Sequence, residues 1–193
     1  MSQVRLESSP LVLDQAEMSE VTPESSQAEL DLPEDSVPAW VYPYKVGVTG
    51  GALGGLVMVA VAIMYGIFSG RGVWLPVNLI GATLVRDLQG ASIETLSQFS
   101  SAALVAGLLL HAAISVGLGF VFAVLLPTMP GPPMIWSLTV GPLLWSIASL
   151  LVLPALNPVM AEHVEEGSFF VAHVVYGIVL GWWIPRTPKI HAE

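Results

Sequence analysis

Four long runs without Asp, Glu, Lys or Arg constrain the fold of this chain more than any other feature. They cover residues 46–68, 101–126, 134–156 and 168–184. A helix needs about 20 apolar residues to cross a hydrocarbon core roughly 30 Å thick. Lipid offers no hydrogen bonds, so each crossing segment must satisfy its backbone groups internally, as a helix does. The sequence therefore predicts an all-α integral membrane protein with four transmembrane helices in an antiparallel bundle.

The composition agrees with a membrane protein and excludes several other classes. Hydrophobic residues make up 54% of the chain and charged residues 11%, with a mean hydropathy of +0.73. Soluble domains of this size are far more polar. The chain has no Cys, which excludes disulfides, thiolate metal sites and iron-sulfur clusters. Residues 40–193 form the predicted membrane domain, and too little polar chain remains for a soluble catalytic domain.

The leader, residues 1–39, carries most of the net charge of −9. It has a single basic residue, Arg5, and nine acidic ones: Glu7, Asp14, Glu17, Glu20, Glu24, Glu29, Asp31, Glu34 and Asp35. A segment this polar buries too little apolar surface to offset its chain entropy. It also lacks the basic start and apolar centre of a signal peptide. We expect an extended or disordered acidic arm, which either stays in solvent or lies on a partner protein.

The first run begins with a glycine ladder. Gly47, Gly51 and Gly55 recur every four residues, with Gly50 and Gly54 on the adjacent row. Helices in lipid gain little from apolar contact alone and associate where small residues let their backbones approach. The ladder therefore predicts a tight helix contact, with a partner either in this chain or in another one.

The connections between the runs differ in kind. Residues 73–85 are too short and too interrupted by Pro to cross, so we expect an interfacial or re-entrant segment that ends at Arg86 and Asp87. The Pro-rich turn 127–133 is short and predicts that the second and third spans are antiparallel neighbours. Pro142 removes a backbone donor inside the third span and predicts a kink. Residues 157–167 form a polar loop.

Basic residues next to the spans indicate an orientation. Four crossings place both termini on one side, where Lys45, Arg186 and Lys189 lie, against Arg71 and Arg86 on the other. Basic residues are enriched on the cytoplasmic side. We therefore expect a multi-pass protein of the bacterial inner membrane with both termini in the cytoplasm. Trp40, Tyr42 and Tyr44, just before the first span, are typical of a membrane interface.

Two histidines are the candidate cofactor-binding residues. His111 lies in the second span with small residues at four-residue intervals, and His173 lies in the fourth span in a similar pattern; the small residues are Gly107, Ser115, Gly119, Gly177 and Gly181. The two spans run in the same direction, and the histidines lie at similar depths. Such a pair could ligate haem b, and either one could bind a chlorophyll-type pigment.

The alternative for both histidines is hydrogen bonding across helix interfaces. The candidate partners are Ser115, Ser146, Ser149 and Tyr176. A polar side chain in the membrane is costly unless it is bonded, and such bonds already account for both residues. On this interpretation no cofactor is expected, and the glycines Gly107, Gly177 and Gly181 serve helix packing, as Gly47, Gly51 and Gly55 do.

Other chemistry has little support in the sequence. The spans contain no Asp, Glu, Lys or Arg, which argues against an ion-coupled transporter or a proton pump. Glu162, His163, Glu165 and Glu166 cluster in the loop before the fourth span and could bind a metal, but a solvated loop is the ordinary explanation, so we assign no metal site. Catalytic motifs and basic patches for nucleic acid are absent, so we expect no enzyme.

Four short motifs resemble a group of bacterial membrane proteins. They are VWLPVNLIGATLV (73–85), LLPTMPGPP (125–133), GPLLW (141–145) and LNPVM (156–160). They are similar to segments of bacterial four-helix proteins that accompany respiratory complexes of the alternative complex III and haem-copper oxidase kind. The similarity covers residues 70–185. It implies membership of a respiratory assembly and carries no catalytic residue with it.

These observations favour a non-catalytic accessory subunit of a multi-subunit bacterial electron-transfer complex. It would pack on other integral membrane subunits through its glycine-rich helix faces and place its acidic arm on a partner. The first alternative is a haem- or pigment-binding electron-transfer subunit that uses His111 and His173. A second is a small channel or transporter lined by the third span, against which the lack of charge in the spans argues.

Overall fold

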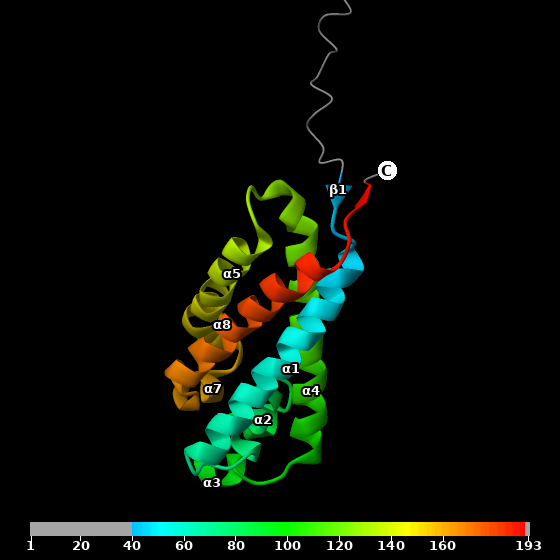
Figure 1. The fold of residues 1–193 in the computed structure, drawn as a ribbon. Helices are drawn as coiled ribbons and strands as arrows, with labels where there is room; N and C mark the ends of the chain where they lie inside the picture. Colours follow the sequence, from blue (N-terminus) through cyan, green and yellow to red (C-terminus); the bar gives the residue numbers. More distant parts are fainter. Residues whose placement is uncertain (1–39, 192–193) are drawn as a thin grey trace, which may run out of the picture. The chain divides into compact units, whose positions relative to one another are not determined.

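The computed structural model describes residues 40–191, and it confirms the all-helical fold with four long apolar helices (Figure 1). The helices long and apolar enough to cross a membrane extend over Tyr44–Phe68, Ser101–Thr128, Pro133–Leu156 and Glu166–Arg186. Each overlaps one of the four predicted runs. The chain is therefore a multi-pass membrane protein as judged by helix length and composition. The predicted acidic arm, residues 1–39, lies outside the described residues.

The regular core of each crossing is an α-helix. These helices are α1 (Tyr44–Phe68), α4 (Ser101–Leu125), α5 (Pro133–Ile147) and α8 (Glu166–Trp183). A short 3₁₀ segment, η5 (Leu126–Thr128), extends α4, and another, η7 (Ile184–Arg186), extends α8. The third crossing continues beyond α5 through η6 (Ala148–Val152) and α6 (Leu153–Leu156).

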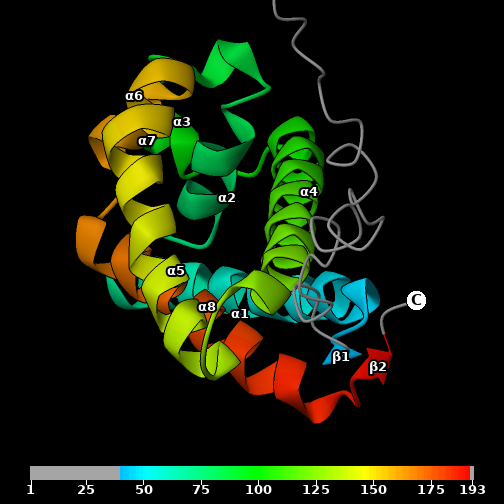
Figure 2. The ribbon, with the colours of Figure 1, turned by 90° about the horizontal axis from the view of Figure 1, so that it is seen from above.

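The four crossings pack in the order α4, α1, α8, α5 (Figure 2). Helix α1 packs on both α4 and α8, whereas α5 packs on α8 and has no extensive interface with α4. All three interfaces join antiparallel helices, as predicted. The expectation that the turn 127–133 makes the second and third spans neighbours is wrong. Helices meet where small residues allow it, and Ser115 and Gly119 of α4 face α1 while Gly141 of α5 faces α8.

Four short helices cap the bundle at the end opposite the two strands (Figure 1). They are α2 (Trp74–Gly81), η4 (Arg86–Leu88), α3 (Ile93–Leu96) and α7 (Pro158–His163). A buried apolar cluster joins α2 to α3, α6 and α7 through Leu75, Leu79, Leu96, Leu153 and Met160. The predicted non-crossing segment between the first two spans is thus a short helix that is covered by protein, as backbone near the membrane requires.

The third crossing departs from α geometry after Pro142. Helix α5 continues through this proline, and the departure is the π-helical turn η6, which ends two residues before Pro154. A proline offers no N–H to the carbonyl four residues earlier, and its ring clashes with that carbonyl. We attribute the wider turn to Pro154, because a π-bulge relieves this clash.

The two ends of the membrane domain meet in a short ribbon that the sequence did not predict. Strand β1 (Trp40–Val41) pairs antiparallel with β2 (Ile190–His191), with Trp40 opposite His191. The ring of Trp40 packs edge-on against that of His191 at 5.3 Å between centroids. Both ends of the domain therefore lie on the same side of the four crossings, as an even number of spans requires.

Candidate functional site

The glycine ladder of α1 forms a backbone-to-backbone seam with α4. A Cβ atom on Gly47 would overlap the carbonyl oxygen of Gly119, and one on Gly51 would overlap that of Ser115. At Gly55 the added carbon would lie 2.7 Å from the Cβ atom of Ser115. Only glycine fits at these three positions, so the ladder sets the distance between α1 and α4.

The second row of the ladder faces α8. An added Cβ on Gly50 would lie 3.2 Å from Leu180 and from Trp183, and one on Gly54 would lie 2.6 Å from the ring of Tyr176. Both glycine rows of α1 are therefore covered within this chain. We expected this face to dock on a larger complex, but the structure uses it internally, because α4 and α8 supply matching small residues and rings.

A matching seam joins α5 and α8. Gly141 lies against the carbonyl oxygen of His173, and Gly177 lies against that of Ser137. Gly181 packs on the Ser137 hydroxyl and on Met134. The same pattern, His-xxx-small-xxx-Gly, occurs in α4 and α8. In α4 its small residues contact α1, and in α8 they contact α5.

Gly107 has a different role from the other glycines of its stripe. It faces α2, where an added Cβ would lie 3.1 Å from the carbonyl oxygen of Val77 and 3.2 Å from the nitrogen of Gly81. Gly81 in turn packs on Ala103. Gly107 therefore holds the cap helix, and not another crossing, against α4.

The middle of the bundle contains a polar cluster formed by His111, Ser115 and Tyr176, of which Ser115 and Tyr176 are buried and His111 is partly buried. The Nε2–H of His111 donates to the Gly55 carbonyl at 3.0 Å, and the Ser115 hydroxyl lies 3.5 Å from the same nitrogen. The Tyr176 hydroxyl donates to the main-chain carbonyl of Ser115 at 2.6 Å. Three crossings, α1, α4 and α8, are thereby joined by polar contacts at one level.

His173 is buried but bonds within its own helix. Its Nδ1–H donates to the carbonyl oxygen of Phe169 at 2.8 Å, and the Phe169 ring packs edge-on against the imidazole at 4.5 Å between centroids. Four hydrogen-bond partners for the histidines were expected from the sequence. The structure places one of them, Ser115, beside a histidine, and that histidine is His111. Ser146 donates instead to the Pro142 carbonyl and Ser149 to the Glu166 carboxylate.

The ring nitrogens of the two histidines are engaged differently in this structure. Axial ligation needs a free ring nitrogen and space for a macrocycle on that side. The Nε2 atom of His111 already bonds Gly55, and the α1 and α4 backbones touch beside it. A macrocycle there would have to separate the two helices. His173, with its Nδ1 engaged and Nε2 directed away from that bond, retains the geometry of a single ligand.

A second polar network, which sequence reasoning missed, fixes the cap. The Asn157 amide donates to the Leu79 carbonyl at 2.7 Å and to the Thr83 hydroxyl at 2.8 Å. Its oxygen accepts from Gln89 at 3.0 Å and from the Met160 N–H at 3.2 Å. The available signal was the dipeptide Asn157-Pro158, since Asn is a preferred N-cap and Pro a preferred first helical residue.

Asn78 plays a related role on α2. It is fully buried, and its amide donates to the carbonyl oxygens of Leu96 and Gln98 at 2.8 and 2.6 Å. These bonds tie α2 to the end of α3. Together with Asn157 they make the cap a cross-linked unit, which explains why short helices can keep a fixed position beside the crossings.

In the acidic loop before α8, the carboxylate of Glu165 caps the start of the helix. The Glu165 carboxylate accepts from the N–H groups of Gly167 and Ser168 at 2.9 and 2.6 Å, and these bonds lower its pKa below the ordinary value of 4.5. The Glu166 carboxylate accepts from the Trp145 indole at 3.1 Å. Within residues 40–191 there is no group of three or more His, Asp or Glu side chains placed to hold a metal ion.

Because no known protein matches the chain, any assignment of a function rests on the geometry of the site. No family model, curated protein or solved structure matches the chain. The polar side chains described in the crossings mostly bond to main-chain carbonyls, either across a helix interface, as His111 and Tyr176 do, or within their own helix, as Ser146 and His173 do. Such an arrangement positions helices.

Proposed function

We propose that this protein is a non-catalytic accessory subunit of a multi-subunit bacterial membrane electron-transfer complex of the respiratory kind. The polar cluster of His111, Ser115 and Tyr176 is the observation that supports it most directly. Its histidine, serine and tyrosine are engaged with one another or with backbone carbonyls, and so stabilise the bundle. The respiratory assignment comes from the motif resemblance in the sequence.

The flank of α5 is the surface we assign to partner subunits. Helix α5 has one extensive interface with another crossing, that with α8, whereas α1 and α8 each have two, and α4 packs on both α1 and the cap helix α2. The remaining surface of the third crossing, α5 with η6, is apolar and exposed, with Ile135, Leu143, Leu150 and Leu151 between 54% and 72% exposed. Since the glycine faces are covered within the chain, other integral membrane subunits would have to pack on such a flank. The acidic arm, which lies outside the described residues, remains a predicted contact with a partner protein.

Co-purification tests the proposal. The tagged full chain, extracted from native membranes in a mild detergent, should bring down a defined set of respiratory membrane subunits that mass spectrometry can identify. Recovery of the chain alone, as a monomer or homodimer, would contradict a subunit role.

Two matched variants locate the contact. Leu151→Trp on the α5 side should lower recovery of the partners, because a bulky ring is tolerated in lipid but not in a packed protein interface. Leu56→Trp, at an equally exposed site on α1, is the control. Equal losses in both variants would assign the contact elsewhere.

An absorption spectrum separates this proposal from the cofactor alternative. The purified full chain should show no Soret or chlorophyll-type band. A stoichiometric band that disappears in His173→Ala, which removes the histidine with the ligand-like geometry, would replace the accessory role by electron transfer or pigment binding.

A further inference from the structure

The two ends of the membrane domain differ in net charge, although Arg71 and Arg86 lie at the capped end. The end that carries β1 and β2 has three basic residues, Lys45, Arg186 and Lys189, and within residues 40–45, 122–133 and 183–191 it has no carboxylate. The described carboxylates lie at the capped end: Asp87, Glu94, Glu162, Glu165 and Glu166. The strand end of the domain therefore presents an excess of positive charge next to the membrane.

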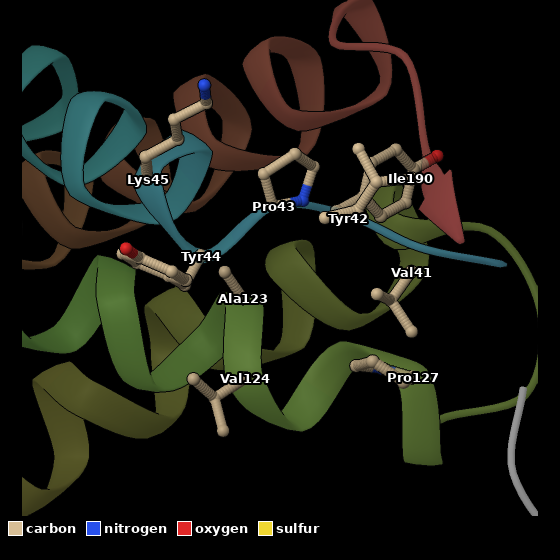
Figure 3. A pocket seen from close by; sticks show the side chains of 9 residues that line it. All are labelled: Val41, Tyr42, Pro43, Tyr44, Lys45, Ala123, Val124, Pro127 and Ile190. Atoms are coloured by element: carbon tan, nitrogen blue, oxygen red, sulfur yellow. The ribbon is translucent and has the colours of Figure 1, made fainter. Parts of the chain in front are cut away.

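An open cavity of about 420 Å³ lies at this strand end (Figure 3). Its walls come from the start of α1, the end of α4 and the C-terminal strand, and include Val41, Tyr42, Tyr44, Val124, Pro127 and Ile190. The volume is within the range of roughly 300–1,000 Å³ that is typical of small-molecule sites. The walls are mainly apolar, with two tyrosines at the depth where aromatic residues meet lipid headgroups.

One lysine lines the cavity, and a second lies over a tyrosine of its wall. Lys45 contributes to the lining, and in Figure 3 its ammonium points away from the wall formed by Val124 and Pro127. The Lys189 ammonium lies over the ring of Tyr42, 5.2 Å from its centroid. Arg186, in contrast, stacks on Trp182 and donates to its carbonyl, so it is engaged within its own helix end. The apolar hollow thus has positive charge at its edge, the arrangement expected of lysines that keep their ammonium groups in water.

We propose that this cavity binds an anionic phospholipid, with the upper part of an acyl chain against Val124 and Pro127 and the phosphate near Lys45 and Lys189. The occupant follows from charge complementarity and from position. The cavity opens beside the first turn of one crossing and the last turn of another, where lipid is the available apolar ligand. Basic sites at the cytoplasmic side of membrane helices bind anionic headgroups, and this end is the one predicted to be cytoplasmic.

Native mass spectrometry of the full chain released from nanodiscs tests the lipid. Nanodiscs with equal amounts of phosphatidylglycerol and phosphatidylcholine should yield the protein with one retained phosphatidylglycerol. A lysine near an anionic surface contributes enough to change binding about fivefold. Lys45→Gln should therefore reduce the retained fraction about fivefold, and the double variant with Lys189→Gln should reduce it further. The full chain is used so that the nine leader carboxylates are present as competitors.

Two controls make the result specific. Arg71→Gln removes one positive charge at the opposite end of the domain and should leave retention unchanged. Val124→Trp, which fills the cavity, should abolish retention, whereas Val121→Trp, at an exposed site on the same helix, should not. Equal retention of the two lipids, or the same loss in Lys45→Gln and Arg71→Gln, would overturn the proposal, as would retention that survives Val124→Trp in a folded protein.

Discussion

The hydroxyl of Tyr176 on α8 donates a 2.6 Å hydrogen bond to the main-chain carbonyl of Ser115 on α4, two crossings that are separated by α1 in the packing order. The bond is possible because Gly54 of α1 has no side chain: a Cβ there would lie 2.6 Å from the tyrosine ring. The ring passes over the glycine and reaches the far helix. One residue therefore joins three crossings.

Loss of this hydroxyl should weaken the bundle measurably. Tyr176→Phe keeps the ring over Gly54 and removes only the bond to Ser115. Polar contacts between membrane helices contribute about 0.6 kcal/mol on average and up to about 1.7, and we expect a loss in this range by reversible unfolding in detergent. Tyr44→Phe is the control, because that tyrosine is 67% exposed. An equal effect in both variants would mean that the Tyr176 bond contributes nothing.

A single methyl group at Gly51 should separate α1 from α4. Gly51→Ala places a carbon against the Ser115 carbonyl, and overpacking of this kind lowers the free energy of unfolding by about 1–3 kcal/mol. Gly117→Ala on α4 is the matched control, since nothing lies within 4 Å of its added carbon. Alanine is the better helix former by about 1 kcal/mol, so the control should be neutral or more stable. Thermal unfolding in detergent distinguishes the two, and a stable Gly51→Ala would refute the seam.

Asn157 should control the stability of the cap more than that of the crossings. Asn157→Ala leaves the Leu79 carbonyl without its partner, and an unsatisfied buried group costs about 1–3 kcal/mol. We expect faster hydrogen exchange and proteolysis in residues 83–92, with slow exchange kept in α1 and α8. Gln98→Ala, an exposed side chain in the same cap, should change neither. Uniform loss of protection along the chain would show that the cap is not a separate unit.

The Glu165 cap predicts a pH dependence at the start of α8. Because the folded-state pKa of Glu165 is lowered from 4.5, its contribution to stability is fully present above pH 4.5 and is lost as the pH falls through the lowered value. At neutral pH Glu165→Ala should destabilise the helix start by about 0.5–2 kcal/mol, and this difference should shrink below pH 4.5. Hydrogen exchange of Ser168 and Phe169 measures it. Glu162→Ala serves as control, and a pH-independent difference would exclude the charged cap.

Labelling of single cysteines should place the two ends of the domain on opposite sides of the membrane. The natural chain has no Cys, so every signal comes from the introduced residue. In intact cells, Glu94→Cys at the capped end should react with an impermeant maleimide, and Pro188→Cys at the strand end should react only after lysis. The reverse pattern would invert the predicted orientation, and labelling of both from outside would contradict four crossings.

Particular residues show where sequence reasoning succeeded and where it stopped. The glycine ladder indicated a close contact, since Gly51 can serve few other purposes in a membrane helix, but the pattern could not say which helix fills it. The turn 127–133 suggested that the second and third spans pack together, whereas Gly141 faces His173 on α8. Chain connectivity limits which helices can meet, and the surfaces of the helices decide which do.

The sequence by itself determined that four helices cross the membrane, because length, hydropathy and the absence of charge are local properties of each segment. Only the tertiary structure decided that both glycine rows are used within the chain, that His111 bonds the Gly55 carbonyl, and that Asn157 holds the cap. These outcomes depend on the fit between surfaces far apart in the sequence. That fit is a property of pairs of helices, which the periodicity of one helix does not contain.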